Sequence, residues 1–205
     1  YYLGYYDEAL KHFVTLAQLD PDNATAYNNQ GHALNALGRF DEALETFNRS
    51  IRLHLEEVQA YEGKMNSLIA LNRLGEALFV CGEIFKLDPE NAHALFLKGE
   101  ILFQREEYED AARAYQQASE LDPNNSIYLS SQAAALLRTH RYQEALDTYE
   151  KSIDLDNKNA AAWHGKADTL MALDRYEEAL QAYKMNIQLA PEEAVTYSNM
   201  GNALN

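Results

Sequence analysis

The stretch Ala-Tyr-Asn-Asn-Gln-Gly-His-Ala-Leu at residues 26–34, followed by Gly-Arg-Phe-Asp-Glu-Ala-Leu at 38–44, decides the fold of this chain. In its first part, Tyr27, Gly31 and Leu34 step by four and three residues. Its second part continues the same spacing, which places apolar side chains on one face of a helix. The stretch therefore predicts two amphipathic helices of about 14 residues each, joined by a tight turn.

The same pattern returns every 34 residues along the chain. One column of equivalent positions holds only alanine and two hold only leucine. These columns are Ala9, Ala43, Ala77, Ala111, Ala145 and Ala179; Leu19, Leu53, Leu87, Leu121, Leu155 and Leu189; and Leu34, Leu68, Leu102, Leu136, Leu170 and Leu204. A fixed period of this length is typical of stacked helical repeats, in which each unit buries its apolar face against its neighbours.

Aromatic residues and prolines keep the same period. Most aromatic side chains fall in three columns, one of which runs Phe13, Phe47, Cys81, Tyr115, Tyr149 and Tyr183. We assign them to the core. All four prolines occupy one phase, at Pro21, Pro89, Pro123 and Pro191. A proline cannot continue the preceding helix, so these residues mark the ends of units.

The motif at 26–44 resembles a tetratricopeptide repeat, whose pattern is an aromatic residue, Leu-Gly, Tyr, Ala, an aromatic residue, Ala and Pro. The resemblance covers the whole chain and implies an all-α fold, a right-handed superhelical solenoid of antiparallel helix pairs with about 12 helices. We expect residues 1–205 to form a single array. It would comprise a second-helix half-repeat at 1–23, full repeats at 24–57, 58–91, 92–125, 126–159 and 160–193, and a first-helix half-repeat at 194–205. Both ends fall inside a repeat, so we expect a fragment of a longer chain.

Charge and composition limit the partners. The chain carries 32 acidic residues against 17 Lys and Arg, a net charge of −15. Such a chain is repelled by phosphate backbones and anionic lipid surfaces, so we expect neither nucleic acid nor membrane as a partner. No apolar run approaches the length of a membrane span. The single cysteine, Cys81, fits a reducing compartment, and we expect a cytoplasmic protein.

The sequence offers no recognisable catalytic site. The nine glycines are scattered, without a phosphate-binding loop. His164 and Asp168 are spaced for half a metal site, but no third ligand is evident, and we expect no metal, cofactor or catalytic residue. Cys81 falls in a core column, which favours inert packing. The chain is therefore predicted not to be an enzyme.

The resemblance implies that the first helix of each repeat lines a concave groove for a peptide or partner helix. Transferring that phase predicts a set of partner-binding residues. They are Asn28, His32, Glu62, Asn66, Phe96, Glu100, Phe103, Ile127, Ser130, Leu137, Arg138, His164, Asp168 and Asn202.

Four of these residues are large and apolar: Phe96, Phe103, Ile127 and Leu137. They predict either an apolar docking patch or packing among themselves or against a neighbouring helix, and both interpretations stay open. The acidic members, Glu62, Glu100 and Asp168, would favour a partner that carries Lys or Arg. The predicted partner is therefore an apolar, basic protein segment.

The function predicted from these features is that of a scaffold for protein–protein interaction. Two alternatives remain. The chain could be a regulatory or targeting segment of a larger enzyme. It could also be a self-stacking assembly module, associating end to end through exposed terminal helices.

Overall fold

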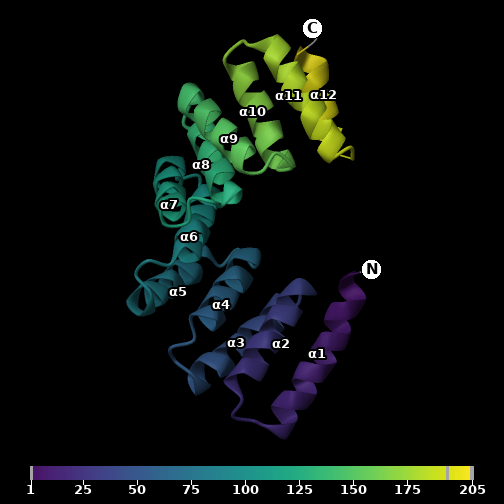
Figure 1. The fold of residues 1–205 in the computed structure, drawn as a ribbon. Helices are drawn as coiled ribbons and strands as arrows, with labels where there is room; N and C mark the ends of the chain where they lie inside the picture. The colour runs from purple at the N-terminus through teal and green to yellow at the C-terminus, as the bar shows by residue number, and fades with distance from the viewer. Residues whose placement is uncertain (1, 193, 204–205) are drawn as a thin grey trace. The chain divides into compact units, whose positions relative to one another are not determined.

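A computed structural model of the chain describes residues 2–192 and 194–203. These residues form helices joined by short connections, with no strand among them (Figure 1). The helices are α1 (Tyr2–Leu19), α2 (Ala24–Ala36), α3 (Phe40–Leu53), α4 (Val58–Ala70), α5 (Leu74–Leu87), α6 (Ala92–Gln104), α7 (Tyr108–Leu121), α8 (Ser126–Arg138), α9 (Tyr142–Leu155), α10 (Ala160–Ala172), α11 (Tyr176–Leu189) and α12 (Ala194–Ala203). The all-α prediction is confirmed.

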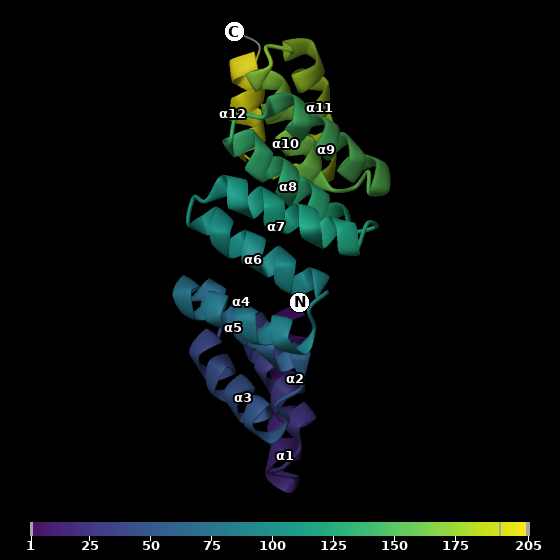
Figure 2. The same cartoon turned by 90° about the vertical axis from the view of Figure 1, so that its left-hand side faces the viewer.

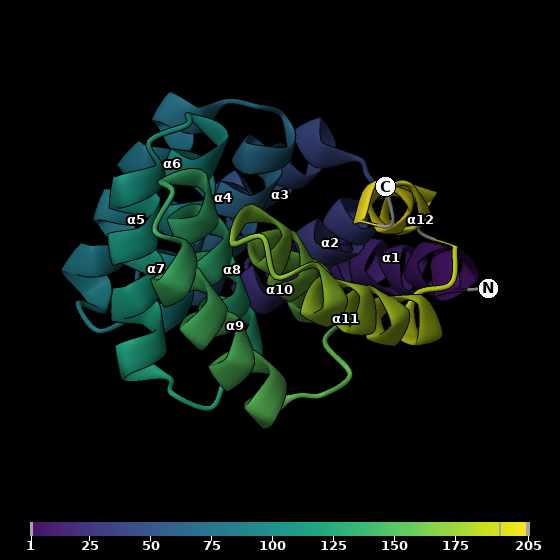
Figure 3. The same cartoon turned by 90° about the horizontal axis from the view of Figure 1, so that it is seen from above.

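The chain divides into two compact units, Tyr1–Leu97 and Lys98–Asn205, with the division inside α6. In the first unit, α1 to α4 each pack against the next helix along the chain, and α2 also contacts α4. In the second unit, α7 to α12 pack in the same sequential way (Figures 2 and 3). There α10 additionally contacts both α8 and α12. The first helices of successive pairs therefore lie side by side within each unit.

The turn inside each helix pair has one geometry throughout. After α2, the Gly38 N–H donates to the carbonyl of Asn35 (3.0 Å) and the Arg39 N–H donates to that of Leu34 (2.9 Å). This is a Schellman motif, which requires a left-handed residue after the helix end. Gly38 has φ 73°. The same turn recurs every 34 residues with a non-glycine residue in the left-handed conformation, at Asn72, Glu106, His140 and Asp174.

Asparagines begin several of the first helices. The side chain of Asn23 accepts a hydrogen bond from the Ala26 N–H (2.9 Å), and that of Asn159 accepts from the Ala162 N–H (3.1 Å). Such an N-cap supplies an acceptor to a backbone donor that the helix itself leaves unpaired. These caps help to set where the first helix of a pair begins.

The core follows two of the three identical columns. The alanines from Ala43 to Ala179 are all 0% exposed, and the leucines from Leu34 to Leu170 are at most 8% exposed. Leu204 lies outside the described residues. The third column behaves differently, since Leu19 is 80% exposed and Leu155 45% exposed. Its members end α1 and the second helix of each pair, where fewer neighbours surround a side chain.

Within the first unit, the ring of Phe47 is closely packed between two helices that flank α3. Phe47 is 0% exposed and belongs to an apolar cluster with Leu34, Ala43 and Ala60. A Cβ added at Gly31 or Gly63 would lie only 2.6 or 2.3 Å from the ring. The helices on either side can approach α3 this closely because both positions lack a side chain.

The described helices include none that is both long enough and apolar enough to cross a lipid bilayer.

Candidate functional site

A hollow of about 560 Å³ opens in the second unit, along the face where α8, α10 and α12 lie next to each other. Five predicted partner-binding residues line it, so the structure brings together this part of the predicted groove: Phe103, Leu137, Arg138, His164 and Asp168. The other lining residues are Ala134, Tyr149, Ala161, Gly165 and Val195. Most of these side chains are small or apolar, with charged groups at Arg138 and Asp168.

Tyr108 organises two of the lining residues. Its ring meets that of Phe103 edge to face, with centroids 5.1 Å apart. The Arg138 guanidinium lies over the same ring, 4.4 Å from its centroid. Cation–π attraction and an edge-to-face aromatic pair each contribute about 0.5–1.5 kcal/mol. Phe103 is thereby held partly buried while Arg138 stays exposed, which places an apolar and a cationic group in the wall of the hollow.

Asp168 is the centre of a hydrogen-bond network. Its Oδ1 accepts from the Tyr183 hydroxyl (2.5 Å) and from the Asn199 side-chain amide (3.1 Å). Its Oδ2 lies 3.3 Å from His164 Nε2, and His164 Nδ1 lies 3.0 Å from the Thr196 hydroxyl. The network ties α10 to α11 and α12.

The electrostatic consequence is a carboxylate that stays ionised. Burial alone would raise the pKa of Asp168, but the hydrogen bonds from His164 and Tyr183 outweigh it and hold the pKa below its ordinary value. Burial raises the pKa of Tyr183, and the hydrogen bond to Asp168 raises it further. The hydroxyl therefore remains a donor at neutral pH.

Tyr149 and Gly165 line the hollow but were assigned no site role from the sequence. Tyr149 is only 3% exposed, and its ring and hydroxyl lie so close to Gly165 that a Cβ there would be 2.2 Å away. Burial raises the pKa of Tyr149, as does the negative charge of Asp168. Their position in the aromatic column and in a helix interior indicated packing, and no single-sequence signal marked them as lining residues.

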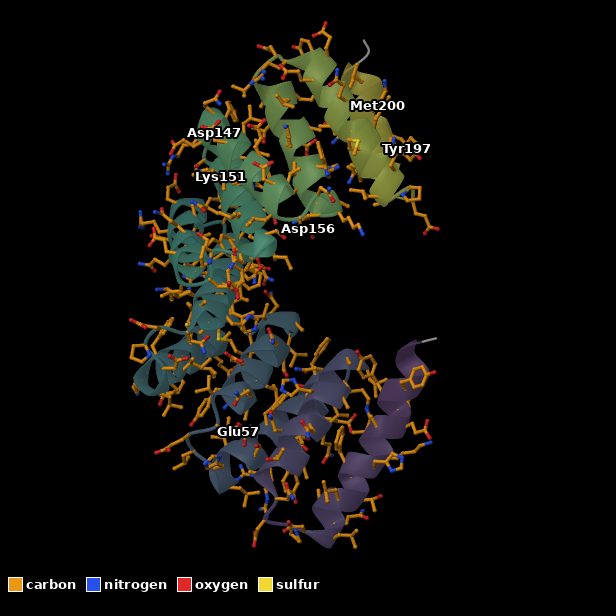
Figure 4. All side chains as sticks on the ribbon, in the orientation of Figure 1. Glu57, Asp147, Lys151, Asp156, Tyr197 and Met200 are labelled. Atoms are coloured by element: carbon orange, nitrogen blue, oxygen red, sulfur yellow. The ribbon has the colours of Figure 1, made fainter. Side chains whose placement is uncertain are left out.

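The predicted residues of the first unit are placed differently. Asn28 is buried and donates to Glu57 (3.2 Å; Glu57 is labelled in Figure 4). The His32 ring meets that of Phe47 edge to face, 5.1 Å between centroids. Glu62 accepts from the Asn91 side chain (3.0 Å). Two others lie on the surface or beside a ring: Asn66 is exposed, and Phe96 stacks on His93 with centroids 6.1 Å apart.

The remaining predicted residues belong to the second unit but do not line the hollow. Ser130 is buried and donates to the Ile127 carbonyl (3.0 Å), whereas the Ile127 side chain is 55% exposed. Glu100 accepts from the Tyr115 hydroxyl (2.5 Å). The Asn202 side chain lies outside the described residues. Asn28 and Ser130 are thus turned inward: Asn28 donates to Glu57 in the following connection, and Ser130 donates to a carbonyl one turn earlier in its own helix.

Metal-ligating side chains do not gather in the part of the chain that the structure describes, where no three of His, Cys, Asp and Glu are grouped to hold an ion. Cys81 is buried in α5, with its sulfur 3.8 Å from the Ala94 carbonyl oxygen. Its environment is that of a packed side chain.

Three protein-family models match the sequence. Two are described as tetratricopeptide repeat and cover residues 1–58 and 136–195. The third is described as anaphase-promoting complex, cyclosome, subunit 3, and covers residues 70–152. No curated protein matches the sequence.

Solved structures share the fold. A chain of the APC/C hetero-tetramer Cut9–Hcn1 superposes with a TM-score of 0.88 at 17% identity over 98% of this chain, which spans 40% of that chain. YrrB, described as a TPR protein with an unusual peptide-binding site, gives 0.68 at 20% identity over 93% of this chain and 98% of YrrB. Yeast Tom70 gives 0.78 at 21% identity over 95% of this chain and 42% of Tom70. At these identities the likeness shows the fold.

Proposed function

Because the chain belongs to the tetratricopeptide-repeat family, we propose that it is a protein-interaction scaffold that binds a polypeptide segment in the hollow of its second unit. The observation that carries this proposal is that five residues predicted from repeat phase line one hollow of about 560 Å³. A space of this size accommodates side chains of a bound segment. YrrB, which shares the fold, is described as having a peptide-binding site.

The proposed partner is apolar and basic. Phe103, Leu137 and Val195 offer apolar surface for an apolar side chain. Glu100 and Asp168 accept hydrogen bonds from tyrosine hydroxyls, the pKa of Asp168 is held below its ordinary value, and the chain as a whole carries −15. Their charge attracts Lys or Arg that flank the apolar side chain, while Arg138 can donate to main-chain carbonyls.

Random peptides displayed on phage and selected on the immobilised chain provide ligands that test this. We expect Phe103→Ser and Leu137→Ser to weaken the selected peptides about tenfold or more, since burial of a large apolar side chain contributes about 1.5–3 kcal/mol. Fluorescence anisotropy with purified variants measures the loss.

The matched control is Leu155→Ser, which changes a 45% exposed leucine on α9 that does not line the hollow. It should leave binding unchanged. Retention of every selected peptide by both hollow variants, at wild-type affinity, would exclude this hollow as the binding site.

A second candidate function is self-association, favoured by apolar side chains exposed on α12. Val195 is 63% exposed and Tyr197 50% exposed (Tyr197 is labelled in Figure 4). Burial of such a face between two copies would stabilise a dimer. We expect Tyr197→Ser to lower the average mass measured by light scattering at high protein concentration. A wild-type chain that stays monomeric at every concentration contradicts this candidate.

A further inference from the structure

Three successive repeats of the second unit carry a tyrosine at the same repeat position. In two of them the tyrosine hydroxyl donates a hydrogen bond to an acidic side chain, and in the third it does not. Tyr115 donates to Glu100 and Tyr183 donates to Asp168. Each hydrogen bond is 2.5 Å long, and each acceptor lies 15 positions earlier in the chain. The intervening equivalent is Tyr149, and the residue 15 positions before it is Ala134. The internal acceptor is therefore missing from this one pair.

Within residues 2–192 and 194–203 the Tyr149 hydroxyl forms no hydrogen bond, and it is not among the fully enclosed unpaired polar atoms, so it can be reached from the hollow that Tyr149 lines. A bound segment that covers this hydroxyl without supplying an acceptor would leave it buried and unpaired, at a cost of about 1–3 kcal/mol. Tyr149 and Ala134 both line the hollow. Because Ala134 has no carboxylate, there is room in the hollow for an acceptor that a bound segment supplies.

We propose that Tyr149 is a specificity-determining residue of the hollow and donates a hydrogen bond to the side-chain carbonyl oxygen of a glutamine in the bound polypeptide. This inference rests on the proposed function and names the residue that enters the hollow. The basic residues of the partner then flank this glutamine and face Glu100 and Asp168.

The charges around Tyr149 select an amide over the alternatives. Asp168 lines the hollow together with Tyr149 and would repel a glutamate or aspartate that approached the hydroxyl, while the Arg138 guanidinium in the same wall is already placed over the Tyr108 ring. A lysine ammonium has no acceptor for the hydroxyl proton. A glutamine carboxamide accepts from Tyr149 and can donate toward Asp168, while its methylene stem contacts Leu137 and Val195.

The test is a double-mutant cycle with peptides selected on the wild-type chain. We expect one position of these peptides to be enriched in glutamine, and its replacement by leucine to weaken binding about fivefold, the contribution of one hydrogen bond. On Tyr149→Phe, which keeps the ring and removes the hydroxyl, the two peptides should bind equally. The cycle isolates the hydroxyl from general effects on the fold.

Ala134→Asp provides an independent variant, because it copies the arrangement of Asp168 with Tyr183 into the hollow. It should satisfy Tyr149 internally and weaken the glutamine peptide by fivefold or more, with an unchanged circular dichroism spectrum. Absence of glutamine enrichment, or an undiminished glutamine preference in Tyr149→Phe, overturns the inference. If Phe103→Ser still weakens binding about tenfold or more in that case, the proposed function stands without this inference.

Discussion

Replacement of Phe47 by alanine is expected to lower the free energy of unfolding by about 3–5 kcal/mol, as is typical for deletion of a buried aromatic ring. Phe47 is fully buried, and its ring occupies the space that Gly31 and Gly63 leave open. Since alanine cannot fill that space and rigid helices close only partly around it, a cavity remains. Urea unfolding followed by circular dichroism measures the loss.

The matched control is Phe79→Ala in the same unit, where the ring is 71% exposed. Its stability should change by no more than about 0.5 kcal/mol. A loss of similar size in both variants would contradict the packing described for Phe47.

The same contact can be tested from the glycine side. Gly63→Ala introduces a Cβ 2.3 Å from the Phe47 ring and should destabilise by roughly 1–3 kcal/mol through overpacking. Gly82 lies inside α5 with nothing within 4 Å of an added Cβ. Gly82→Ala should therefore stabilise, by up to about 1 kcal/mol, because alanine favours the helix. Opposite signs for one substitution in one unit would show that the ring contact decides the outcome.

The repeat period made the fold predictable, because every unit must bury the same face against its neighbours. It also located the turns, although their chemistry differs. Gly38 suits a left-handed turn residue, whereas Glu106 and His140 adopt that conformation with a side chain that disfavours it. Only the equivalence of positions along the chain indicates a turn at those two residues. The register of packed helices imposes the local backbone there.

Part of the site followed from the same phase, and part did not. Phe103, Leu137 and Asp168 belong to the predicted set and line the hollow, while their role in binding stays a prediction. Asn28 has the same phase but is buried, since its amide pairs with Glu57 from the following connection. Such a pairing depends on side-chain lengths across two helices, which a period cannot specify. The sequence placed Tyr149 in a core column and so gave it no site role. Its missing hydrogen-bond acceptor becomes apparent only because the equivalent tyrosines, Tyr115 and Tyr183, each donate to an acid.

Replacement of Asp168 by alanine is expected to destabilise the second unit by about 2–4 kcal/mol at neutral pH. The hydroxyl of Tyr183, a residue that is 1% exposed, would lose its acceptor, and Asn199 and His164 would lose theirs. An unpaired buried donor costs about 1–3 kcal/mol. The chain has a single tryptophan, Trp163, which lies on the same helix, α10, so urea unfolding followed by its fluorescence reports on this region.

Asp168→Asn separates the charge of this residue from its shape. The pKa of Asp168 is lowered in the folded chain, so the stability that its ionised form contributes is present above the unfolded pKa, about 3.9, and is lost as the pH falls through the folded value. The difference in stability between wild type and Asp168→Asn should therefore be largest above about pH 5 and shrink below about pH 4. Asp147→Asn, at an exposed carboxylate on α9 (Figure 4), is the control and should show no comparable difference. A difference for Asp168→Asn that stays constant from neutral to acidic pH would mean that the carboxylate acts only through its shape.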